Sequence, residues 1–129
     1  MELRKISQEE LNEIIENHRH WLNRDCDGWE KMRADLSYID LRRANLRDVD
    51  LRQAIFRGAD LRDTNLTCAD LSHADLTRAS LINADLSGAN YSFNFIFTLT
   101  MSWNKRIIKS KFYQQINNKG EIDYYDQKK

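Results

Sequence analysis

Carboxylates are the side chains of this sequence with the clearest capacity for chemistry, because a pair of them can act as general acid and base. Between residues 34 and 93, however, Asp or Asn recurs every five residues in ten of twelve units, with Ile55 and Ser80 as the exceptions. So regular a spacing indicates that these acids belong to a structural repeat and were not brought together for catalysis. We therefore expect no catalytic residues and no enzymatic activity.

The sequence also gives no clear indication of a metal site or a cofactor site. His18, His20 and Cys26 suggest a metal site, but two histidines at positions i and i+2 of a helix point apart, so we expect no bound metal. His73 lies in an outward repeat position and reads as a surface histidine. The sequence has no glycine-rich phosphate loop, nucleophile motif or cofactor fingerprint, and we expect no cofactor.

The five-residue period itself decides the fold class. Leucine or a close substitute occupies one position in every unit, and a small or modest apolar residue lies two positions before it. An α-helix would advance this row by about 140° per unit, so no apolar stripe would form. A flat strand would send successive leucines to opposite faces, because the period is odd. The remaining solution is a coil that turns a corner in every unit. The twelve central residues are Leu36, Leu41, Leu46, Leu51, Phe56, Leu61, Leu66, Leu71, Leu76, Leu81, Leu86 and Tyr91.

This pattern resembles the pentapeptide-repeat family, as in the run Ala69-Asp70-Leu71-Ser72-His73-Ala74-Asp75-Leu76. The resemblance covers residues 34–93 and implies an all-β solenoid, a right-handed quadrilateral β-helix with four units per coil and thus about three coils. The central residue and the small residue before it would fill the interior, and the other three positions would face solvent. With coils stacked about 4.8 Å apart, the repeats would rise only about 14 Å.

Both flanks are expected to cover the ends of this solenoid, whose edges would otherwise be exposed. Residues 1–33 form the predicted N-terminal helical cap, because Ser7 and Glu10 begin a capping box and apolar residues then follow at helical spacing, which predicts a helix from Gln8 to Leu22. Residues 94–129 form the predicted C-terminal cap or interaction segment, through which a homodimer could form. The sequence allows two alternatives for this segment, a hairpin around residues 117–120 or an amphipathic helix over 104–116.

The formal net charge is zero, but its distribution is uneven: −2 over residues 1–33, −2 over 34–93 and +4 over 94–129. Arginines gather in the first six units, and aspartates continue throughout. These arginines either compensate the stacked carboxylates or form a basic end of an interaction surface whose acidic end lies further along the chain. Two apolar outward residues could add anchors to this surface. The candidate interaction residues are Arg42, Arg47, Arg62, Asp70, Asp75, Asp85, Tyr38 and Ile55.

Cys26 and Cys68 are too few for a disulfide framework, the N-terminus lacks a secretion signal, and residues 93–103 are too short and polar to span a membrane. We therefore expect a cytoplasmic protein without membrane contact.

Two functional hypotheses remain. The first is an inhibitor or shield that occupies the nucleic-acid-binding surface of a DNA-processing enzyme, either a topoisomerase or a defence nuclease such as a CRISPR effector. It comes from the family resemblance, which includes rod-like mimics of duplex DNA, although the near-neutral charge and short height make this chain a weak mimic. The alternative is a protein-protein interaction scaffold without a nucleic-acid link. Direct DNA binding is not expected, because the arginines are interleaved with aspartates and lack stacking aromatics.

Overall fold

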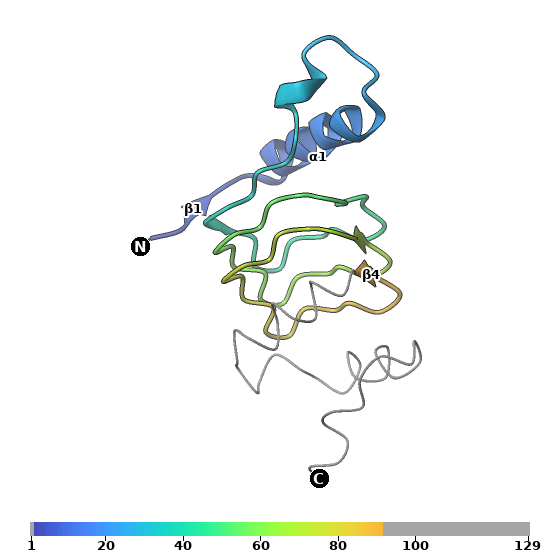
Figure 1. Cartoon of the computed structure of the whole chain (residues 1–129). Helices are drawn as coiled ribbons and strands as arrows, with labels where there is room; N and C mark the ends of the chain where they lie inside the picture. Colours follow the sequence, from blue (N-terminus) through green and yellow to red (C-terminus); the bar gives the residue numbers. More distant parts are fainter. Residues whose placement is uncertain (1, 92–129) are drawn as a thin grey trace.

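The computed structural model describes residues 2–91, in which helix α1 lies above a stack of short loops and strands (Figure 1). All four strands are two residues long. The elements in chain order are β1 (Arg4–Lys5), α1 (Gln8–Asn23), the 3-10 helix η1 (Trp29–Lys31), β2 (Ile39–Asp40), β3 (Asp70–Leu71) and β4 (Asn90–Tyr91).

Helix α1 begins and ends at residues suited to those positions. Ser7 is the N-cap, and its hydroxyl accepts a hydrogen bond from the Glu10 N–H at 3.0 Å. The Glu10 side chain contacts Arg4 at 2.7 Å instead of turning back to Ser7. At the other end Arg24 adopts a left-handed conformation (φ 54°), and its N–H donates to the His20 carbonyl. The helix is one residue longer than the sequence predicts.

The repeat region folds back on itself at intervals of twenty residues, which is four units. Seven isolated parallel bridges join residues twenty apart, and β3 pairs with β4 at the same interval. Hydrogen bonds pass in both directions, as from the Leu51 N–H to the Asp70 carbonyl at 2.8 Å and from the Asp70 N–H to the Val49 carbonyl at 3.0 Å. We call each run of twenty residues a layer: the first is 34–53, the second 54–73, and the third is described as far as residue 91.

A left-handed residue ends each repeat and turns the chain. Every non-glycine residue at this position from Tyr38 to Asn83 has φ between 56° and 63°, and Gly58 and Gly88 have φ 65° and 71°. A hydrogen bond closes the corner, as from the Ala54 N–H to the Leu51 carbonyl at 3.0 Å. This repeated corner turns the chain once in every unit, as the five-residue period predicts.

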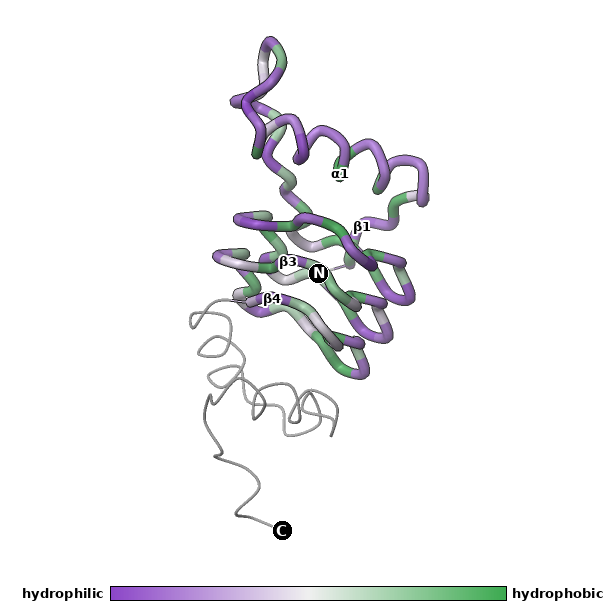
Figure 2. The backbone as a smooth tube through the Cα atoms, turned by 90° about the vertical axis from the view of Figure 1, so that its right-hand side faces the viewer, coloured by the Kyte–Doolittle hydropathy of each residue, from purple (hydrophilic) through white to green (hydrophobic). Residues whose placement is uncertain are grey.

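Leucines and alanines fill the interior, as the sequence predicts, and Figure 2 shows these hydrophobic positions alternating with hydrophilic ones along the stacked layers. Leu36, Leu46 and Phe56 are completely buried. Thr64 takes the place of an alanine and is also buried, and its hydroxyl donates to the Leu41 carbonyl at 3.0 Å. The buried hydroxyl is thereby satisfied within the repeats.

The residue before each central leucine explains why Asp or Asn recurs. In most units its side-chain oxygen accepts a hydrogen bond from the backbone N–H two residues later, as Asp40 does from Arg42 at 3.1 Å and Asn45 does from Arg47 at 3.1 Å. Neutral Asn and charged Asp make the same contact, so this position is selected for the local turn and not for charge alone.

Two N-terminal elements pack onto the first layer. Strand β1 pairs in parallel with β2, and Leu11 of α1 is buried in the same apolar cluster as the repeat leucines. His18 is fully buried beneath the helix, where its Nδ1 accepts from the Ala34 N–H at 2.9 Å and its Nε2 donates to the Arg52 carbonyl at 2.8 Å. Two ring nitrogens thus satisfy two backbone groups at the top of the repeats.

Within the part of the chain that the structure describes, no helix is long and apolar enough to span a membrane. Both cysteines are free thiols. The predicted C-terminal cap, the alternatives of hairpin and helix, and any homodimer contact through residues 94–129 lie outside the described residues.

Candidate interaction surface

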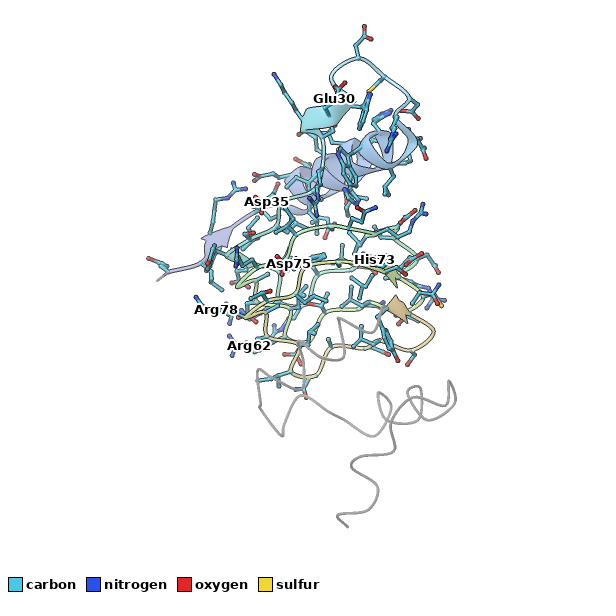
Figure 3. All side chains as sticks on the ribbon, in the orientation of Figure 1. Glu30, Asp35, Arg62, His73, Asp75 and Arg78 are labelled. Carbon is cyan, nitrogen blue, oxygen red and sulfur yellow. The ribbon has the colours of Figure 1, made fainter. Side chains whose placement is uncertain are left out.

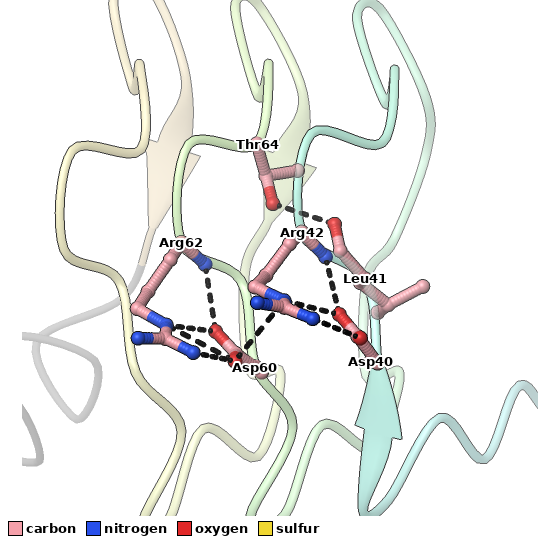
Figure 4. A network of polar contacts seen from close by, with 6 residues as sticks. All are labelled: Asp40, Leu41, Arg42, Asp60, Arg62 and Thr64. Atoms are coloured by element: carbon pink, nitrogen blue, oxygen red, sulfur yellow. Dashed lines mark hydrogen bonds and ion pairs between the residues drawn. The ribbon is translucent and has the colours of Figure 1, made fainter. Parts of the chain in front are cut away.

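A ladder of alternating acids and arginines runs across the first two layers (Figure 4). Arg42 clamps Asp40 with contacts of 2.8 and 2.9 Å, and Arg62 clamps Asp60 in the same way at 2.6 and 2.8 Å. Arg42 also lies 3.7 Å from Asp60, which links the two layers. We call these four residues the Asp-Arg ladder.

The ladder holds its acids strongly ionised. The Arg42 hydrogen bonds lower the pKa of Asp40 from 3.8 to about 2, and Arg62 lowers the pKa of Asp60 by the same mechanism. Because each arginine is paired within its own unit, the ladder is largely self-compensating, which is the first of the two interpretations of the arginines. The two arginines, with Asp40, Arg43 and Asp63, line a surface hollow of about 340 Å³.

Three acids later in the repeats have different partners. Asp70, Asp75 and Asp85 each accept from the backbone N–H two residues later and from the hydroxyl of that residue, which is Ser or Thr. The Thr77 hydroxyl and N–H lower the pKa of Asp75, so this carboxylate is ionised near neutral pH. These donors fix the carboxylates in position and are themselves uncharged. Positive charge lies further off: Arg52 is 3.9 Å from Asp70, and the charges of Arg57 and Arg33 also lower the pKa of Asp75. We call the three acids the acidic set.

The structure brings only some of the predicted interaction residues together. Arg42 and Arg62 lie in one column, and Ile55 lies directly beside Asp75 through a parallel bridge. Asp70 instead bridges Asp50. Side chains in Figure 3 project from several sides of the stack, with Arg62 and Arg78 at its left edge and His73 toward its right.

Other candidates are less available than the sequence suggests. Tyr38 lies over Gly58, where an added Cβ would meet the tyrosine ring at 2.5 Å. Arg47 contacts the neighbouring Asp48 at 3.3 Å. The eight predicted residues therefore do not form one continuous patch, and Tyr38 covers backbone of its own chain.

Sequence reasoning named His18, His20 and Cys26 near α1, but it missed the contacts of His18 and the approach of Asp25 to the other two residues. His18 links the helix to the repeats, and its ring stacks on Trp21, with centroids 5.4 Å apart. His20, Asp25 and Cys26 bring potential metal-ligand atoms within 4.8 Å of one another, and they are the one such group found among residues 2–91. The signal was present in the sequence as Asp25 and Cys26 directly after the helix, but the left-handed turn at Arg24 that places them was not evident.

The repeats match a known family. Its profile, described as pentapeptide repeats, covers residues 32–67 and 54–90 with eight copies. The chain belongs to the pentapeptide repeat family. This family implies a right-handed β-helix, and its members are generally protein-interaction proteins and generally non-enzymatic.

Two solved structures of pentapeptide repeat proteins are similar to part of this chain. Rfr23, from the cyanobacterium Cyanothece 51142, is 35% identical with a TM-score of 0.45, over 46% of this chain and 41% of that one. AT2G44920, from the Arabidopsis thaliana thylakoid lumen, is 44% identical with a TM-score of 0.44, over 44% of this chain and 39% of that one. The chain thus spans about two fifths of the length of each. Among curated proteins no match is found.

Proposed function

We propose that this pentapeptide repeat protein uses the acidic set to occupy the basic nucleic-acid-binding surface of a DNA-processing enzyme, such as a topoisomerase or a defence nuclease, and thereby inhibits or shields it. The observation that carries the proposal is that Asp70, Asp75 and Asp85 each accept a hydrogen bond from a neutral hydroxyl, and that Arg52 approaches Asp70 no closer than 3.9 Å. In the Asp-Arg ladder the donors are guanidinium groups, which cancel the charge.

The charge composition of the repeats also differs between their first and last parts. Residues 34–63 contain six Asp and six Arg, a net charge of zero. Residues 64–91 contain three Asp and one Arg, a net charge of −2. Fixed carboxylates at this end can contact lysines and arginines that otherwise bind phosphates. Preorganised side chains also lose little conformational entropy on binding.

The proposal gives the N-terminal elements a supporting role. Strand β1 and helix α1 act as the cap of a right-handed quadrilateral β-helix of about three coils, and residues 94–129 serve the opposite end as cap or interaction segment. The contacts of His18 and the pairing of β1 with β2 support the first assignment. Such a cap protects the exposed edge of the first layer from pairing with another chain.

A protein-protein scaffold without a nucleic-acid link is the alternative. It is favoured by the Asp-Arg ladder, because a self-compensated surface with a hollow of about 340 Å³ suits a partner of mixed charge. Ile55, which is partly buried beside Asp75, would then act with the arginines as an anchor.

The test is affinity capture from the native host with three matched baits: the wild-type chain, the acidic set reversed to Lys (D70K/D75K/D85K), and a control with the same charge change away from both surfaces (E30K/D35K/D48K). We expect the wild type and the control to capture a DNA-processing enzyme, and duplex DNA to displace it. The variant D70K/D75K/D85K should capture none. A partner that all three baits retain equally, and that duplex DNA does not displace, supports the scaffold instead.

A further inference from the structure

The end of helix α1 gathers three side chains of different ligand chemistry outside the repeats. Arg24, in its left-handed conformation, reverses the chain after the helix. Asp25 and Cys26 therefore return alongside His20, which lies in the last turn of the helix. The imidazole, carboxylate and thiol offer ligand atoms that all lie within 4.8 Å of one another.

We propose that His20, Asp25 and Cys26 bind a divalent transition metal ion, for which Zn²⁺ is the best fit. Nitrogen, oxygen and sulfur donors together suit Zn²⁺ and Co²⁺, whereas Ca²⁺ and Mg²⁺ take oxygen ligands. Ordinary bond lengths and tetrahedral angles place zinc ligand atoms about 3.3–3.6 Å apart. Ligand atoms separated by up to 4.8 Å would have to move closer together, and His20 Nδ1 and Asp25 Oδ1, which are 2.6 Å apart, would have to move apart.

Contacts around His20 support a ligand role for one ring nitrogen. Nδ1 lies 2.6 Å from Asp25 Oδ1, and the metal would replace the proton between these two atoms. Nε2 faces the Glu16 carboxylate at 3.5 Å. A carboxylate behind a metal-binding histidine orients the ring and strengthens it as a ligand.

The remaining contacts leave the other two ligands able to turn toward the ion. Arg19 lies 3.6 Å from Asp25 Oδ2, which holds that oxygen and leaves Oδ1 for the metal. Cys26 is half-buried, and its thiol contacts the Met32 sulfur at 3.7 Å. Water completes the coordination. The side chains of His20 and Asp25 are 28% and 38% exposed, so their separation can adjust.

A metal here would fix the connection between α1 and the first layer. The 3-10 helix η1 in this connection has no buried residue. Little apolar packing therefore holds residues 24–33, and a bound ion can supply the cross-link that packing does not.

The experiment adds Co²⁺ and Zn²⁺ to the reduced full-length chain. We expect one equivalent of Co²⁺ to bind, to give a thiolate-to-cobalt charge-transfer band, and to be displaced by Zn²⁺. Cys26→Ser should abolish the band, and His20→Gln and Asp25→Asn should each weaken binding by about tenfold or more. The far-UV circular dichroism spectrum of each variant should match that of the wild type.

The chain supplies a matched control for each ligand. It has two cysteines and three histidines, so Cys68→Ser and His73→Gln test the other exposed candidates, and Asp27→Asn tests the neighbouring acid. All three should bind Co²⁺ as the wild type does. Absence of the band in the wild type, its persistence in Cys26→Ser, or equal binding by His20→Gln would overturn the proposal.

Discussion

The left-handed residue that ends each repeat is the most demanding position in the chain. A side chain in this conformation costs roughly 1–2 kcal/mol relative to glycine. Among residues 2–91, ten non-glycine residues nevertheless adopt it, nine of them in the repeats and one, Arg24, at the end of α1. The stacking of neighbouring layers must offset this cost, so a change at such a position tests the packing of the layer above it.

Gly58 gives the sharpest test of this kind. Gly58→Ala adds a methyl group that meets the Tyr38 ring at 2.5 Å, and we expect a loss of at least about 1–2 kcal/mol in the free energy of unfolding, measured with urea. Gly28→Ala is the matched control, since Gly28 also has a positive φ but nothing within 4 Å of the added Cβ. In a Tyr38→Ala background the excess cost of Gly58→Ala should disappear. If that excess persists, Tyr38 does not cover Gly58.

Substitution of an interior leucine tests whether the central residue of each repeat points into the interior and the residue after it points to solvent. Leu61 is completely buried, so Leu61→Arg places a charge in a narrow apolar interior, at an expected cost of several kcal/mol in urea unfolding. Thr77→Arg should be tolerated, because Arg in the equivalent position of other units clamps its Asp, as Arg62 clamps Asp60. Equal tolerance of both changes would contradict the β-helix arrangement.

Ionised aspartates predict the response to acid. The pKa of folded Asp40 is about 2, below its ordinary value of 3.8, so its contribution to stability is fully present above about pH 4. That contribution is lost as the pH falls from about 4 toward 2. Asp40→Asn should remove this part of the pH dependence in denaturant titrations, while the amide oxygen still accepts from the Arg42 N–H, as Asn45 does from Arg47. An unchanged acid profile would show that Arg42 does not stabilise the carboxylate.

At the scale of elements, α1 is held by polar as well as apolar contacts. His18 and β1 form hydrogen bonds with backbone groups of the first layer. Removal of residues 1–22 would expose these groups, and we therefore expect aggregation, which light scattering can measure. His18→Leu is the finer variant, because it keeps an apolar side chain but loses both hydrogen bonds. It should stay soluble and lose roughly 1–3 kcal/mol in urea unfolding. A soluble, monodisperse truncation would show that α1 is an interaction arm and not a cap.

The sequence predicts the periodic elements well and the joins between them poorly. Every Leu from 36 to 86 reports its burial through the five-residue spacing, and Ser7 marks the start of α1. The position of Tyr38 over Gly58 follows from the same twenty-residue arithmetic, but the size of the gap above a glycine is visible only in three dimensions. The contacts of His18 depend on how α1 docks, which no periodicity encodes.

In the candidate sites, too, contacts within a repeat can be predicted from the sequence and contacts between elements cannot. The pairing of Arg42 with Asp40 was open to prediction, because residues on either side of a buried leucine face the same way. The approach of Asp25 to His20 was not, since it depends on the left-handed conformation of Arg24, a residue type that seldom adopts it. Local pairs are thus readable from spacing, and contacts across a chain reversal are not.

For the whole molecule, charge is organised along the stack of layers. The first two layers carry the neutral Asp-Arg ladder, and the acidic set extends from the second layer into the third. Residues 94–129 add seven basic and three acidic residues to the chain. A chain of zero formal net charge thus distributes its charge unevenly along the sequence, which favours orientation-specific binding over general attraction.

This organisation predicts how the whole chain responds to duplex DNA. At physiological salt we expect the wild type not to bind a labelled duplex in fluorescence anisotropy, because its net charge is zero and four arginines of the repeats are paired with aspartates. These are Arg42, Arg47, Arg52 and Arg62. D70K/D75K/D85K changes the net charge by six units, so it should bind weakly and lose that binding as salt rises. R42E/R47E/R62E makes the opposite change and should remain without binding. Tight, salt-resistant binding by the wild type would mean that the protein recognises DNA itself, and the proposal that its carboxylates replace DNA on an enzyme would then be wrong.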